Sequence, residues 1–215
     1  MATAQMTVDQ FYHRLIDWYL QEERTDPHSQ IGQLAFYRDL SIRQTIDNAV
    51  FGRYTVGDLQ YFSTHYKYFP QHVGAQEKAR DKLLKIQPAL LKAKDFMELY
   101  SIVRTATQSV APGKLSLLFF YDTTLRIGAS AAVGREPTKV FLQRGALWGA
   151  QATGISLADR TDKNPYINVQ VFYQLSNRFR DLKAMDIETL LCVKEGEIAR
   201  FMNFERPEER LEEGI

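Results

Sequence analysis

Hydrophobic positions recur every three or four residues through most of the chain, which is the period of an amphipathic α-helix. The first run begins after Thr7, where Gln10 is placed to complete a capping box, and it continues to about Glu23. After Asp26-Pro27 a second helical region runs over residues 34–50, with a break expected near Asp39. The N-terminal part of the chain is therefore expected to be helical.

The middle of the chain continues the helical period with several interruptions. Residues 53–56 lie between two glycines and are expected to form a connection, after which Asp58 can cap a helix containing Leu59, Phe62 and Tyr66. Residues 75–91 are rich in helix formers, and Pro88 must kink this helix or start a new one. Asp95 then opens a further helix, which fades before residues 112–113.

Small residues replace lysine in the second half. Gly128, Ala131, Gly145 and Gly149 predict surfaces where helices pack closely together. Asn164 followed by Pro165 predicts a helix whose apolar face is formed by Val171, Phe172, Leu175, Phe179 and Leu182. Alternation over residues 167–173 leaves a short strand open as an alternative. Asp186 is expected to cap the last core helix through Leu190, Leu191 and Val193.

These elements together predict an all-α fold, either a compact multi-helix body or two abutting lobes with small-residue packing in the second. The expected division is a helical lobe over residues 1–108, a second helical lobe over 109–204 with a hairpin-like segment, and an acidic tail over 205–215. Any sheet is expected within residues 115–121 or 167–173.

Composition removes several classes of function. The 215 residues carry 27 Lys and Arg against 26 Asp and Glu, so attraction to a polyanion has to come from a local patch. One cysteine, Cys192, and four scattered histidines predict no disulfide framework, no metal site and no cofactor. The chain also lacks a secretory leader pattern and a long apolar run, so we expect a cytoplasmic protein without a membrane partner.

A lysine stripe is the first candidate for function. Lys78, Lys82, Lys85 and Lys92 fall within a narrow stripe of the helical stretch that begins near residue 75, although Pro88 breaks the geometry of the stripe before Lys92. Just before it, residues 61–72 mix aromatic with basic or polar side chains, a combination that stacks bases and neutralises phosphates in single-strand binders. The alternative is that these lysines solvate an outer helix face and the aromatic residues belong to the core.

The second candidate is the segment over residues 110–150, which contains Pro112-Gly113-Lys114 and, further on, the run Tyr-Asp-Thr-Thr-Leu-Arg-Ile-Gly-Ala. That run resembles bacterial proteins of unassigned function, and the segment as a whole resembles a helix-hairpin-helix element. The resemblance implies that Gly113 and Lys114 contact a DNA phosphate through the backbone and the ammonium group. The second hairpin glycine of that family is missing, since Leu115 stands in its place.

Asp122 allows three interpretations. It can cap a helix that ends near Gly128, pair with Arg126 four residues later, or act as a carboxylate of raised pKa in an apolar wall. The sequence thus predicts a non-enzymatic helical module that binds DNA, RNA or a protein partner, with contacts from Lys78, Lys82, Lys85, Gly113, Lys114 and Arg126. The alternative is a base-excision or lyase enzyme in which Lys114 is the amine nucleophile and Asp122 the carboxylate.

Overall fold

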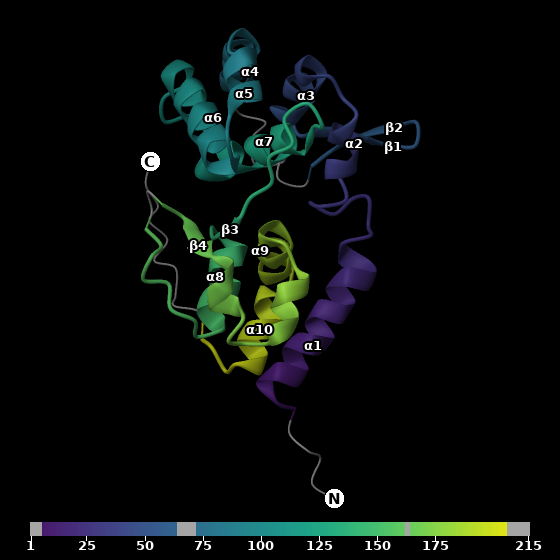
Figure 1. The fold of residues 1–215 in the computed structure, drawn as a ribbon, viewed down its shortest axis with the longest axis vertical. Helices are drawn as coiled ribbons and strands as arrows, with labels where there is room; N and C mark the ends of the chain where they lie inside the picture. The colour runs from purple at the N-terminus through teal and green to yellow at the C-terminus, as the bar shows by residue number, and fades with distance from the viewer. Residues whose placement is uncertain (1–5, 64–71, 162–163, 206–215) are drawn as a thin grey trace, which may run out of the picture. The chain divides into compact units, whose positions relative to one another are not determined.

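A computed structural model describes residues 6–63, 72–161 and 164–205. It is mostly helical, with two small antiparallel sheets of two strands each (Figure 1). The chain divides into two compact units. Trp18–Thr138 forms one, and the residues up to Asp17 join those from Lys139 onward in the other. The division therefore differs in place from the boundary expected near residue 109.

Helices dominate the unit formed by Trp18–Thr138. Its elements are a π-helical segment, η1 (Tyr19–Glu23), then α2 (Leu34–Arg38), α3 (Ile42–Ala49), β1 (Arg53–Val56), β2 (Leu59–Phe62), α4 (Val73–Lys85), α5 (Gln87–Lys92), α6 (Phe96–Val110) and α7 (Leu117–Ala129). α7 packs against α2, α3 and α6, and α4 packs against α6. α7 is consequently the central helix of this unit.

Two helix breaks predicted from the sequence are confirmed in this unit. The chain leaves α2 at Asp39 and restarts at Ser41, whose side chain and that of Gln44 form a capping box at the start of α3. Pro88 lies in the first turn of α5, where its missing N–H removes no helical hydrogen bond. The predicted start of α6 is also confirmed, because Asp95 accepts a hydrogen bond from the backbone of Glu98 at 2.8 Å.

The helix predicted after Asp58 is wrong for the described residues up to Ser63. Residues 53–62 instead form a hairpin in which Val56 pairs with Leu59 across a two-residue turn. Gly57 adopts a φ of +59°, a conformation that suits glycine and is typical of tight hairpin turns. The sequence Val-Gly-Asp-Leu is therefore a turn signal, and Asp58 belongs to the turn. Tyr66, the last residue of that prediction, lies outside the described residues.

α7 begins earlier than the sequence suggested. The Ser116 hydroxyl accepts a hydrogen bond from the Phe119 backbone, so the apolar run over residues 117–121 forms the first turn and a half of a helix. The strand considered for residues 115–121 is therefore wrong. The interpretation of Asp122 as a helix cap is wrong as well, because Asp122 lies in the middle of α7.

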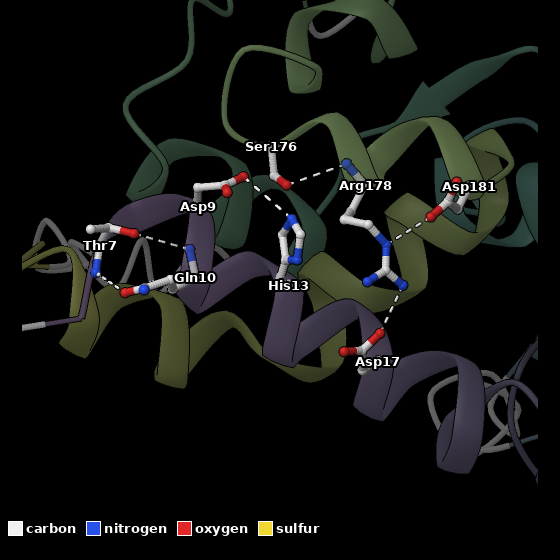
Figure 2. A network of polar contacts seen from close by, with 8 residues as sticks. All are labelled: Thr7, Asp9, Gln10, His13, Asp17, Ser176, Arg178 and Asp181. Carbon is white, nitrogen blue, oxygen red and sulfur yellow. Dashed lines mark hydrogen bonds and ion pairs between the residues drawn. The ribbon is translucent and has the colours of Figure 1, made fainter.

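The other unit is built from both ends of the described chain. Its elements are α1 (Val8–Trp18), β3 (Lys139–Phe141), α8 (Gly145–Ala152), β4 (Tyr166–Asn168), the 3₁₀ segments η4 (Val169–Phe172) and η5 (Asn177–Asp181), α9 (Ala184–Val193) and α10 (Glu195–Phe201). The predicted capping box at the start of α1 is confirmed: the Thr7 amide donates to Gln10 and the Gln10 amide donates to Thr7 (Figure 2).

Contacts from α1 join it to the C-terminal half of the chain. The Phe11 ring stacks on Phe201 with centroids 3.9 Å apart. The Arg178 guanidinium bridges two carboxylates, at 2.7 Å from Asp17 on α1 and at 2.8 Å from Asp181 (Figure 2). α1 is therefore an integral part of this unit, although more than half of the chain separates it from its partners.

The long helix predicted from Asn164 is wrong. Residues 166–168 form β4, which pairs with β3, and only short 3₁₀ segments follow. Local capping explains the interruptions. Asn168 accepts a hydrogen bond from the amide of Gln170, and Ser176 accepts one from the amide of Arg178, so each starts a new turn. The strand alternative over 167–173 is correct only for its first two residues.

Small residues do bring two helices together. A Cβ atom built on Gly149 of α8 would lie 2.3 Å from the backbone oxygen of Leu191 on α9, and one on Gly145 would lie 2.9 Å from Cys192 Sγ. The space next to Gly128 is filled by different neighbours, since a Cβ atom there would meet the carbonyl oxygen of Arg135 at 2.2 Å. The predicted close packing therefore holds for α8 against α9, without Gly128 as a partner.

Candidate functional site

A cavity of about 550 Å³ lies where the start of α4 meets the end of α6. It is bordered by residues of two short stretches: His72, Gly74, Ala75, Lys78, Val110, Ala111, Pro112 and Lys114. Two of the predicted binding residues, Lys78 and Lys114, thus come from distant parts of the sequence to the same cavity. Their ammonium groups are exposed and form no ion pair with any described residue.

A tight turn positions Lys114. The Lys114 amide donates a hydrogen bond to the Ala111 carbonyl at 3.3 Å, with Pro112 and Gly113 between them. Gly113 has a φ of +68°, so the Pro-Gly pair has the signature of a type II turn. The turn ends α6 and directs the chain into α7, and it fixes the backbone of Lys114 at the rim of the cavity.

The N-terminus of α4 supplies the opposite side. His72 precedes the helix without capping it through its side chain, and the first turn carries no acidic residue. Amide groups in the first turn of a helix point away from it along its axis, and together with the helix dipole they favour an anion. Lys78 follows one turn later on the same helix, so the electrostatics at this end of α4 favour negative charge.

A second cavity, of about 450 Å³, lies further along the same two helices. Lys82 of α4 and Ile86, which directly follows that helix, border it on one side. Ser101, Ile102, Thr105, Ala106 and Ser109 of α6 border it on the other. Ser101, Thr105 and Ser109 follow one another at four-residue spacing, so their hydroxyls lie in a row along α6. The two cavities thus border neighbouring stretches of α4 and α6.

Not all of the predicted contacts are at these cavities. Lys85 is exposed near the end of α4, and Gly113 belongs to the turn that presents Lys114. Arg126 lies in the interior on α7, where its guanidinium donates to the Ala49 carbonyl at 3.3 Å and pairs with Asp122 at 3.5 Å. The structure thus brings Lys78, Lys82 and Lys114 to one face of α4 and α6 and places Arg126 elsewhere.

Asp122 is a buried member of an internal ion pair. Its side chain is 2% exposed, and the Arg126 side chain that pairs with it is 9% exposed. The spacing of four residues and the distance of 3.5 Å agree with the ion-pair interpretation. Lys114 is exposed at the turn before α7, so the two residues of the lyase hypothesis occupy different environments. That hypothesis stays a prediction.

Sequence reasoning missed the hydroxyl row of α6. Most of the aromatic segment over residues 61–72 that was expected to bind bases, His65 included, lies outside the described residues. The four-residue spacing of Ser101, Thr105 and Ser109 was a signal available in the sequence. The start of α4 was harder to locate, because no capping side chain marks it.

Within residues 6–63, 72–161 and 164–205, no group of three or more His, Cys, Asp or Glu side chains is arranged to hold a metal ion. No helix in the same residues has the length and apolar character to cross a membrane. Comparison with protein-family models, with curated proteins and with solved structures finds no match to this chain.

Proposed function

We propose that the face formed by α4, the end of α6 and the 111–114 turn binds the phosphate groups of a nucleic acid strand. The observation that carries the proposal is that Lys78 and Lys114, 36 positions apart in the sequence, border one cavity next to the N-terminus of α4, which the His72 side chain does not cap. Lysine ammonium groups and helix N-termini are both common partners of phosphate.

The geometry favours an extended strand over a single small anion. Lys82 lies one helical turn beyond Lys78, a rise of about 6 Å along α4, and borders the adjoining cavity. Lys85 continues the same face. A strand laid along α4 would therefore meet Lys114 and Lys78 first and Lys82 next, while the hydroxyls of Ser101 and Thr105 offer hydrogen-bond donors beside it.

The test measures binding of a fluorescently labelled single-stranded oligonucleotide by anisotropy at several salt concentrations. Affinity is expected to fall as salt rises, because each neutralised phosphate releases counterions, with a slope of roughly 0.7 per contact on a double logarithmic plot. Replacing Lys78 and Lys114 by Gln should weaken binding and reduce the slope by about 1.4.

The matched control replaces Lys92 and Lys94 by Gln. These two lysines are exposed, lie in the same unit and border neither cavity, so the control removes the same charge without touching the proposed site. It should bind nearly as well as the unmodified protein. No measurable binding to single- or double-stranded DNA or RNA at low salt contradicts the proposal, as does an equal loss in both double variants.

A further inference from the structure

A smaller cavity of about 200 Å³ lies in the other unit, between α8 and α10. Trp148 of α8 and Phe204 form aromatic walls, while Gly196 and Ala199 of α10 leave room between them. Glu195, the first residue of α10, contributes the only acidic side chain among the described residues that border it. The cavity thus combines two aromatic rings with one carboxylate.

A helix-ending motif fixes the position of Phe204. Asn203 has a φ of +52°, and the amide of Phe204 donates to the carbonyl of Ala199 at 2.9 Å, while the amide of Asn203 donates to that of Arg200 at 3.4 Å. This pair of hydrogen bonds is the Schellman arrangement, in which the chain folds back over the last turn of the helix. The Phe204 wall is therefore set by the backbone.

The Glu195 carboxylate lacks part of its hydrogen bonding. Its Oε2 atom is buried and has no hydrogen-bond partner among the described residues. The same oxygen lies next to the first turn of α8, at 3.2 Å from the position of a Cβ on Gly145, where the helix dipole favours negative charge. Glu195 also borders the cavity itself, so its carboxylate places negative charge beside the two aromatic walls.

We infer that this cavity binds a small alkylammonium cation, with Glu195 as the counter-ion and Trp148 and Phe204 facing the alkyl groups. The face of an aromatic ring attracts an ammonium group through the ring's quadrupole. It also packs against the methyl groups of an alkylammonium ion, which a hydrated metal ion lacks. A volume of about 200 Å³ limits the ligand to a few carbon atoms around the nitrogen. The inference is independent of the proposed nucleic acid binding.

The test uses choline as the probe and its neutral isostere, 3,3-dimethylbutan-1-ol, as the matched ligand without charge. The readout is the indole N–H signal of Trp148 in proton–nitrogen correlation spectra, assigned by its absence in Trp148→Phe. Choline is expected to shift this signal in a saturable manner, and the neutral alcohol is expected to bind at least about tenfold more weakly because it lacks the cation–π and ionic contributions.

Two variants separate the carboxylate from general electrostatics. Glu195→Gln keeps the size of the side chain and removes the charge, so it should weaken choline binding at least about tenfold. Glu205→Gln removes the same charge from an exposed position beside Phe204 and should leave binding unchanged. The inference is overturned when choline produces no saturable shift of the Trp148 signal, when both ligands bind equally, or when Glu195→Gln binds like the unmodified protein.

Discussion

Tyr37 is a buried side chain whose ionisation makes the stability of the protein depend on pH. Its ring is fully buried in α2, and its hydroxyl donates to the Arg53 carbonyl at 2.5 Å, which joins α2 to the start of the hairpin. Burial raises the pKa of Tyr37 to about 12; the nearby Arg126 charge lowers it and that of Asp122 raises it. Folding therefore favours the protonated hydroxyl.

We expect the free energy of unfolding to fall between about pH 10 and pH 12 through this residue. The raised pKa contributes stability that is complete below pH 10, where an unfolded tyrosine is still protonated. This stability is lost as the pH rises through the folded pKa, and the full loss amounts to about 3 kcal/mol. Tyr37→Phe should be less stable by about 1 kcal/mol at pH 8, because the hydrogen bond is lost, and should become the more stable protein above about pH 11.

Urea unfolding of both proteins at a series of pH values measures this difference directly. Other ionisable groups are common to the two proteins and cancel in the comparison. A constant gap between the two stability curves from pH 8 to pH 12 contradicts the prediction.

At the residue scale, the sequence predicted those features that depend on near neighbours. The Thr7 and Asp95 caps and the Pro88 break were found because a cap acts within three residues. The role of Asp122 could not be predicted from its near neighbours alone. The cap and the ion pair were equally local possibilities, and only the Ser116 cap at the start of α7 decides between them.

At the element scale, the contact of α8 with α9 depends on Gly149. Gly149→Ala places a Cβ atom 2.3 Å from the Leu191 backbone oxygen, and the backbone cannot give way as a flexible side chain does. We expect a loss of about 1–3 kcal/mol, measured as a lower melting temperature in calorimetry. The penalty arises from overpacking and not from helix propensity, which would favour alanine.

Gly196→Ala is the matched control, because it introduces the same methyl group in α10 of the same unit, and a Cβ atom there meets no heavy atom within 4 Å. Its melting temperature should be equal to or higher than that of the unmodified protein, since alanine favours a helix. Equal melting temperatures for the two variants would argue against close packing at Gly149.

Helices were easier to predict than strands in this chain. The hairpin over residues 53–62 was missed because four-residue strands show too little alternation to outweigh a helical pattern, and the decisive signal is the Gly57-Asp58 turn. β3 and β4 contain three residues each and depend on each other for pairing. Their formation is a tertiary event, for which the sequence around either strand offers little local indication.

At the scale of the whole molecule, Trp18–Thr138 is one continuous stretch with its own core around α7, whereas the other unit needs two separate stretches. We predict that a protein consisting of residues 18–138 folds alone, with a helical circular dichroism spectrum and a cooperative thermal transition. Residues 139–215 alone lack α1 and its contacts, and should fold only when residues 1–17 are supplied as a peptide.

Adding the 1–17 peptide stepwise to the 139–215 fragment, with circular dichroism as the readout, measures whether the peptide makes the fragment fold. A peptide with Phe11→Ala and Asp17→Ala is the control, because it lacks the stacking on Phe201 and the bridge to Arg178. A folded 139–215 fragment without peptide, or an unfolded 18–138 fragment, contradicts the prediction. The sequence could not indicate this division, because pairing of distant segments leaves no local periodicity.

The separation of α1 from its partners along the chain also affects folding during protein synthesis. During synthesis α1 leaves the ribosome long before Arg178 and Phe201 exist, and at usual elongation rates the delay is on the order of ten seconds. A helix of this size forms within about a microsecond but is marginal alone, so for that interval the Phe11 face of α1 has no native surface to cover it. In the nascent chain, α1 is therefore the helix most exposed to chaperone binding and to aggregation. In the folded protein, by contrast, Phe11 is among the most buried side chains.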